Sequence, residues 1–355
     1  MILENLQTRH SMDWRDAMSA SITTAEEIAK YLPVDTSHIS QVISHYPMRI
    51  TPYYLSLIKS NTCAIFKQAV PDIQEIINDH MAKDPLCEDL QSPVPNLIHR
   101  YPDRVLFMVS SQCSVHCRFC MRKRKMGNPF IVSQKTVRDG IAYIKQNRYI
   151  HEVILSGGDP LLLEDEELHS IMDQLRSITH VEIIRIHTRI PCTLPQRITP
   201  ALADMLRKHH PVFINIHFNH PDEITDESSS ACAILADTGI PLGSQTVLLK
   251  GVNNDPKIIK RLMQGLLKIR VKPYYLHHPD PVRGTAHFRT SIKEGLDIMK
   301  KLRGHISGLC IPNYMVDLPE GGGKVPLLPE YIKDFSEDRL TIENFEGKMF
   351  DYPED

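Results

Sequence analysis

The sequence lacks the features that define several classes of protein. No apolar run in its 355 residues approaches the roughly 18 residues that a membrane-spanning helix needs. The N-terminal segment MILENLQTRHSMDWRDAM has no apolar core of the kind found in secretory signals. An excess of one charge is also missing, because 41 basic residues are matched by 43 acidic ones and the net charge is −2. These absences predict a cytoplasmic protein with neither a membrane nor a nucleic acid as its partner.

Cysteine is scarce as well, and most of the eight cysteines stand alone, as expected of small buried apolar side chains. The isolated cysteines are Cys63, Cys87, Cys192, Cys232 and Cys310. The other three, Cys113, Cys117 and Cys120, have the spacing C-x3-C-x2-C in the stretch SSQCSVHCRFCMRKRK. In the cytoplasm such a cluster indicates a metal or redox site rather than disulfides.

Short β-branched runs begin near residue 104 and alternate with amphipathic segments. The predicted strands are RVLFMV, EVILS, VEIIRIH, VFINIH, SQTVLL and KPYYLH, and after a longer first gap they recur about every 30 residues. This alternation is typical of βα units around a parallel sheet, which is either a partly or fully closed barrel or an open doubly wound sheet. Because six units are fewer than the eight of a complete barrel, we expect an α/β fold with an incomplete (β/α)6 barrel.

The chain divides into three predicted regions. Residues 1–100 form a mostly helical region, with a threonine before the acidic first turn of TTAEEIAKYL and a proline at the start of the helical pattern in AVPDIQEIINDHM. Residues 101–305 form the barrel. Residues 306–355 are a C-terminal extension, rich at first in glycine and proline, that ends in a predicted hairpin with its turn at Glu346-Gly347.

Polar groups follow most of the predicted strands. They are SSQC, SGGDP, HTR, HFNHP and HHPD, after the first, second, third, fourth and sixth strands. Parallel βα folds bind their ligands at the carboxyl ends of the strands. The sequence therefore predicts one functional site at that edge of the sheet.

The three clustered cysteines favour an iron–sulfur cluster. Structural zinc needs four ligands, usually from two separated pairs, and His116 as a fourth ligand would lie too close in sequence for an easy tetrahedron. Zinc and three unrelated buried cysteines stay as weaker alternatives. Thiolates are the usual ligands of iron–sulfur clusters, whose commoner forms need four. Three thiolates leave one iron open, as in metal sites that bind an exchangeable group.

The segment GGGK, which ends at Lys324, is not a phosphate-binding loop. Leu318 stands where such a loop needs its first glycine, and Val325 stands where it needs a hydroxyl. A lysine on a glycine-rich segment can serve instead as a Schiff-base amine that releases and re-forms its bond to a carbonyl cofactor. The alternative is a surface lysine in a loop.

The cysteine spacing on this fold resembles the signature of the radical S-adenosylmethionine (radical SAM) superfamily. The resemblance implies a radical SAM barrel and a [4Fe-4S] cluster on Cys113, Cys117 and Cys120, with the open iron chelated by S-adenosyl-L-methionine. Gly157 and Gly158 in SGGDP match the glycine-rich segment that lets the backbone approach the methionine end of that cofactor.

Several motifs together resemble the lysine 2,3-aminomutase family of pyridoxal 5′-phosphate (PLP)-dependent radical SAM enzymes. They include HRYPDRVLFMVSSQC, SGGDPLL, IHTRIP, HFNHPDE, SQTVLLKGVNND, PYYLHHPDPVRGTAHFR and SGLCIPNYMVDLPEGGGK, in this order. The resemblance implies an isomerase in which Lys324 binds PLP as an aldimine. It also implies that the PLP phosphate is bound by Arg100, Tyr101 and Arg104. Adenosylmethionine would be bound by His217 and Gln245.

The same resemblance implies the substrate. Arg122 matches the residue that pairs with the substrate α-carboxylate, and Asp280 and Asp317 match the pair that binds a distal ammonium. These ends suit L-lysine, which a 5′-deoxyadenosyl radical mechanism would convert to β-lysine. Arginine and glutamate 2,3-aminomutases are alternatives, as is the same chemistry supplying β-lysine for the modification of elongation factor P.

No cysteine follows Cys310, whereas the longest family members carry further cysteines that bind zinc in their tail, so zinc here is in doubt. The expected partners are an amino acid, an electron donor such as flavodoxin or ferredoxin, and further copies of the chain. Lys123, Arg124 and Lys125 are expected at a solvated surface. Two competing hypotheses are a radical SAM enzyme that modifies RNA, with RFCMRKRK on its phosphates, and an iron–sulfur or zinc module without enzymatic activity.

Overall fold

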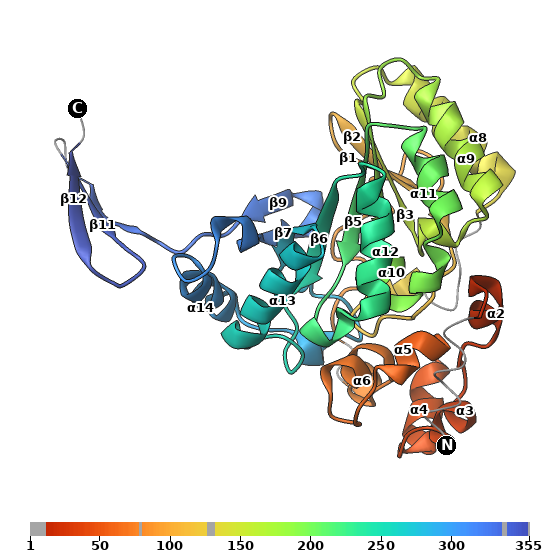
Figure 1. The fold of residues 1–355 in the computed structure, drawn as a ribbon, viewed down its shortest axis with the longest axis horizontal. Helices are drawn as coiled ribbons and strands as arrows, with labels where there is room; N and C mark the ends of the chain where they lie inside the picture. Colours follow the sequence, from red (N-terminus) through yellow and green to blue (C-terminus); the bar gives the residue numbers. More distant parts are fainter. Residues whose placement is uncertain (1–11, 78–79, 126–131, 336–338, 354–355) are drawn as a thin grey trace.

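The computed structural model describes residues 12–77, 80–125, 132–335 and 339–353. Helices of the N-terminal region lie below a sheet with helices along one face, and a small second sheet stands apart at the C-terminal end (Figure 1). The prediction that no secretory signal is present falls largely on residues 1–11, which lie outside the described residues. Within the described residues, no helix has both the length and the apolarity needed to span a membrane.

The N-terminal helices are short and share one hydrophobic core with the sheet and its helices. Thr24 caps the second of them, as the sequence predicts, and it forms a capping box with Glu27. The helical pattern that starts at Pro71 becomes helix only at Gln74. The helices are α2 Trp14–Ser19, α3 Ala25–Ala29, α4 Thr36–Ile43, α5 Pro52–Ser56, α6 Ala64–Ala69 and α7 Gln74–Ile77.

The main sheet has nine strands in the order of the chain, β1 to β9. Strands β2 to β8 are parallel, and β1 and β9 pair antiparallel at the two edges. The six predicted strands are confirmed as β2 to β7, and β8 adds a parallel strand inside the predicted C-terminal extension. The strands are β1 Leu97–Tyr101, β2 Arg104–Ser110, β3 Glu152–Gly157, β4 Ile183–Thr188, β5 Val212–His217, β6 Leu242–Val247, β7 Val271–His277, β8 Asn313–Leu318 and β9 Gly323–Pro326.

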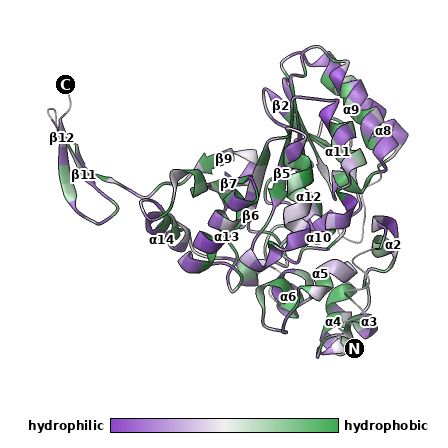
Figure 2. Ribbon diagram, in the orientation of Figure 1, coloured by the Kyte–Doolittle hydropathy of each residue, from purple (hydrophilic) through white to green (hydrophobic). Residues whose placement is uncertain are grey.

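Amphipathic helices connect the parallel strands and cover the outer face of the sheet (Figure 1). In the helix before β7, the buried residues Ile259, Leu262, Met263 and Leu266 follow helical spacing. Hydrophilic colours predominate on the outer faces of α8 and α9, whereas β5 between the helices is hydrophobic (Figure 2). The helices are α8 Gln134–Gln146, α9 Asp165–Arg176, α10 Ile190–Thr193, α11 Pro200–Arg207, α12 Asp226–Asp237, α13 Pro256–Lys268 and α14 Ile292–Leu302.

The two edges of the main sheet meet through side chains rather than through a ladder of backbone hydrogen bonds. The backbone N–H of Lys324 in β9 donates to the hydroxyl of Tyr101 in β1, at 2.8 Å. Arg100 in β1 donates to Asp317 in β8, at 3.0 Å. The sheet is therefore an incomplete barrel, as predicted, and the polar residues of its two edges lie together.

The end of the chain forms a separate antiparallel sheet of three strands, β10 Ile332–Phe335, β11 Arg339–Glu343 and β12 Met349–Pro353. The predicted hairpin is confirmed, with Gly347 at a φ of 81° in its turn. Lys300 at the end of α14 donates to Glu343, at 2.6 Å, and so links this sheet to the barrel.

Candidate active site

One cavity of about 540 Å³ lies inside the incomplete barrel, at the carboxyl ends of the parallel strands. Every residue for which the sequence predicts a catalytic or binding role lines it. These residues are Arg100, Tyr101, Arg104, Cys113, Cys117, Cys120, Arg122, Gly157, Gly158, His217, Gln245, Asp280, Asp317 and Lys324. The structure therefore brings the whole predicted set together, while the role of each residue stays a prediction.

The three clustered cysteines lie on the loop that follows β2, with their thiols free. Burial raises the pKa of the Cys113 thiol well above its usual value, and the neighbouring Cys120 and Cys117 raise it further. Burial and Cys117 raise the pKa of Cys120 in the same way. Thiolates packed so closely in a buried site need positive charge, which a metal centre supplies. The donor set therefore fits a thiolate-bound cluster.

The predicted glycine pair after β3 packs directly against the backbone at the start of the cysteine loop. The N–H of Gly158 donates to the carbonyl oxygen of Ser110 at 2.6 Å. A Cβ at Gly157 would lie 2.1 Å from that oxygen, and a Cβ at Gly158 would lie 2.1 Å from the carbonyl oxygen of Gln112. Only glycine fits at either position, so the pair supports the cysteine loop in addition to its predicted role beside a cofactor.

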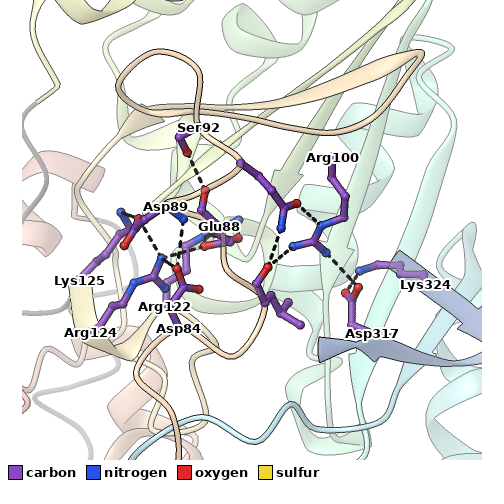
Figure 3. A network of polar contacts seen from close by, with 12 residues as sticks. Asp84, Glu88, Asp89, Ser92, Arg100, Arg122, Arg124, Lys125, Asp317 and Lys324 are labelled. Atoms are coloured by element: carbon purple, nitrogen blue, oxygen red, sulfur yellow. Dashed lines mark hydrogen bonds and ion pairs between the residues drawn. The ribbon is translucent and has the colours of Figure 1, made fainter. Parts of the chain in front are cut away.

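The cavity lining also carries a lysine that pairs with an acid. The Lys324 ammonium forms an ion pair with Asp317, which also accepts from Arg100 at 3.0 Å (Figure 3). Burial raises the pKa of Asp280 to about 7, and the charge of Asp317 adds to this effect. Arg104 pairs with Asp103 at 2.9 Å. The two predicted phosphate-binding arginines therefore have protein partners in this structure.

The basic run that follows the cysteines divides into different environments. Arg122 lines the cavity and pairs with Glu88 (Figure 3). Lys123 was expected at the surface, but this prediction is wrong, because its side chain is fully buried and donates to Glu75 at 2.5 Å. Arg124 and Lys125 pair with acidic residues of the segment before β1.

Comparisons with known proteins agree with this geometry. A family model described as the radical SAM superfamily matches residues 107–262, and one described as lysine-2,3-aminomutase matches residues 299–355. The L-lysine 2,3-aminomutase of Clostridium subterminale is 47% identical over 350 residues, covering 96% of this chain and 84% of that protein. The chain belongs to the lysine 2,3-aminomutase family. A glutamate 2,3-aminomutase of Clostridioides difficile is 42% identical, over 95% of this chain and 82% of its own length.

Membership of the aminomutase family confirms the predicted isomerase class and the predicted cofactors, a [4Fe-4S] cluster, S-adenosyl-L-methionine and PLP. The cavity suits all three. The lining includes the three cysteines, the PLP residue predicted from the sequence, Lys324, and several neutral polar side chains. His217 is one of these, because burial lowers its pKa to about 4 and the charge of Arg189 adds to this effect.

Asp159 and Arg189 are among the lining residues of the aminomutase site for which the sequence predicted no role. Asp159, directly after the glycine pair, accepts from the N–H of Arg189 at 2.7 Å. The guanidinium of Arg189 donates to the Cys117 sulfur at 2.7 Å and to Glu223 at 2.8 Å. The sequence contained a partial signal, since Asp159 and Arg189 stand in the strand-end motifs SGGDP and HTR. Their pairing depends on tertiary structure and is not visible in either motif alone.

Proposed function

We propose that this protein is an L-lysine 2,3-aminomutase that converts L-α-lysine to β-lysine. The observation that carries the proposal is the placement of Arg122 and of Asp280 and Asp317 on the lining of one cavity. A guanidinium suits the α-carboxylate of the substrate, and two carboxylates suit its ε-ammonium. The identity of 47% with an L-lysine 2,3-aminomutase supports the same substrate.

The distal group of the substrate decides between the aminomutases. Glutamate would bring a carboxylate toward Asp280 and Asp317, in a buried site where like charges repel strongly. Lysine brings an ammonium that favours ionised Asp280 and replaces the ammonium of Lys324 beside Asp317. Arginine also offers a cation at this end, so it is the second substrate to test.

The chain's own residues have five proposed tasks in the reaction. Cys113, Cys117 and Cys120 hold the cluster, and Lys324 holds PLP until substrate arrives. Arg100, Tyr101 and Arg104 bind the PLP phosphate, for which Arg100 and Arg104 exchange their present acidic partners. Gly157, Gly158, His217 and Gln245 line the part of the wall proposed for adenosylmethionine. Arg122, Asp280 and Asp317 orient the substrate inside the cavity.

When bound, the three cofactors supply reversible removal of hydrogen from carbon 3 and migration of the amino group from carbon 2 to carbon 3. We further propose that an external protein such as flavodoxin or ferredoxin delivers the electron that first reduces the cluster, which the redox-neutral isomerisation does not consume, and that the chain forms a homo-oligomer. Its β-lysine is either a free product or destined for elongation factor P.

A product assay tests the function directly. Anaerobically purified protein is incubated with dithionite, adenosylmethionine and L-lysine, L-arginine or L-glutamate, and the β-amino acid is measured. We expect β-lysine as the main product. Visible absorption of the purified protein should show a PLP band that Lys324→Ala abolishes. A wild type with the cluster but no PLP band would favour the RNA-modifying or non-enzymatic hypotheses.

A further inference from the structure

A buried carboxylate holds one edge of the Arg122 guanidinium. The Nε of Arg122 donates to both carboxylate oxygens of Glu88, at 3.1 and 3.0 Å, and its Nη2 donates to Oε1 at 2.8 Å. Over the described ranges of the chain, Nη1 has no hydrogen-bond acceptor, and Arg122 lines the cavity. Glu88 therefore fixes the plane of the guanidinium and leaves one amino group for a ligand.

Glu88 is charged although its side chain is only 4% exposed. Burial acts to raise its pKa, but the charge and hydrogen bonds of Arg122 outweigh burial, so its pKa lies below the usual value. Arg124 faces the same carboxylate at 3.5 Å and pairs more closely with Asp84 and Asp89. The acid is thus anchored independently of any ligand, as a residue that orients another residue must be.

The segment that contains Glu88 also contacts Arg100, the partner of Asp317. The carbonyl oxygen of Leu86 accepts from Arg100 at 3.2 Å and from Gln91 at 2.8 Å. Gln91 in turn accepts from Arg100 at 2.7 Å, and Arg100 donates to Asp317 (Figure 3). Residues 86–91 therefore contact Arg122 directly and Asp317 through one side chain.

We propose that Glu88 positions Arg122 for the substrate α-carboxylate. Together with the Leu86 carbonyl and the Gln91 side chain, it sets the spacing between the carboxylate and ammonium ends of the site. The inference rests on the proposed function, because it takes Arg122 and Asp317 as the two ends. A fixed spacing selects chain length, since an amino acid one methylene shorter than lysine cannot reach both ends at once. Glu88 itself is a positioning residue that acts through Arg122.

The test compares Glu88→Gln with Asp89→Asn, a matched control one residue further along. Asp89 pairs with Arg124 and Lys125 and does not line the cavity. We expect Glu88→Gln to raise the KM for L-lysine by about tenfold. The L-lysine concentration that gives half of the maximal change in PLP absorption should rise by the same factor. Iron and PLP content should match the wild type. The preference for L-lysine over L-ornithine, as a ratio of kcat/KM, should fall several-fold, whereas Asp89→Asn should change none of these.

A double-mutant cycle in lysine binding separates positioning from general damage. In the Arg122→Lys background, Glu88→Gln should have little further effect on lysine binding, because the guanidinium that Glu88 orients is gone. Equal losses in both backgrounds, or a wild-type KM in Glu88→Gln, would overturn the proposal. If Glu88→Gln does not fold, Glu88→Asp serves as the second variant because it keeps the charge. It should give a KM between those expected for the wild type and Glu88→Gln, with a lower preference for L-lysine over L-ornithine. An unchanged preference would overturn the proposal.

The binding measurement also separates this inference from the proposed function. A wild type that binds lysine without forming β-lysine contradicts the function alone, and the variants still decide the role of Glu88. A wild type that does not bind lysine overturns both.

Discussion

Arg122 and Lys123 are neighbours in the sequence, yet their environments differ in the way that separates a binding residue from a structural one. The ammonium of Lys123 donates to three acceptors, Glu75 at 2.5 Å and the carbonyl oxygens of Arg118 and Gly284 at 2.7 and 3.0 Å. The guanidinium of Arg122 has one edge bound and, among the described residues, one amino group without an acceptor. A fully satisfied buried charge has nothing left to bind, whereas a partly satisfied charge beside a cavity does.

The carboxylates show the same contrast. Burial acts to raise the pKa of Glu75, but Arg118 and Lys123 outweigh it, so the pKa lies below its usual value. Burial raises the pKa of Asp280 to about 7, and the nearby Asp317 adds to the effect instead of opposing it. Glu75 therefore belongs to the framework under the cysteine loop. At Asp280 the charges of Lys324 and Arg289 do not offset burial, as expected of the ammonium site proposed for it.

The largest expected effect comes from removing the Glu75 carboxylate, whose charge is fully paired. Glu75→Ala leaves Arg118 and Lys123 buried without a counter-charge, and should lower the free energy of unfolding by about 3–5 kcal/mol. Anaerobic urea unfolding measures the loss. Glu164→Ala, which removes the exposed partner of Arg15, is the matched control and should leave the midpoint unchanged. If the two variants behave alike, the buried triad of Glu75, Arg118 and Lys123 is not part of the framework.

The sequence predicted most of the site because its residues stand in short motifs at strand ends. Cys113, Gly158 and Lys324 each combine a residue type with a spacing that limits the possible chemistry. The burial of Lys123 was not predictable, because its partner Glu75 lies 48 residues earlier in a helix of four residues. Local sequence gives the charge of a side chain, and tertiary contacts decide whether that charge is buried.

The same distinction applies to the fold. Strands β2 to β7 were predictable because they are short runs with β-branched or aromatic residues, each followed by a segment with helical periodicity. Strand β8, Asn313–Leu318, is flanked by proline and glycine and is not followed by an α-helix, so its sequence resembles a loop. Its pairing with β7 depends on the barrel already being present. The two edges of the barrel then bring Arg100 to Asp317, a contact that no local pattern indicates.

The next largest effect concerns Asp280, whose raised pKa shows that its charge is not fully compensated. Asp280→Asn should lower activity but raise stability. The variant keeps the shape of the side chain and removes its charge, so kcat/KM for L-lysine should fall about a hundredfold or more. The ligand-free variant should also be more stable at pH 8. The folded-state pKa of about 7 lies above the unfolded value of about 3.9, so ionisation of Asp280 costs stability as pH rises toward 7. Thermal unfolding measures this gain. A variant that loses both activity and stability would place Asp280 in the framework with Glu75.

The smallest effect is the pH dependence of lysine binding to the wild type. Asp280 is largely protonated at pH 6 and largely ionised at pH 8, and only the ionised form attracts the substrate ammonium. The apparent affinity for L-lysine, followed by the change in PLP absorption, should therefore rise about tenfold between these values. The residual binding of Asp280→Asn should show no such rise, because an amide does not titrate. A wild-type affinity that is flat across this range would mean that Asp280 is already ionised in the free protein, and that its environment resembles that of Glu75 more closely than the cavity geometry indicates.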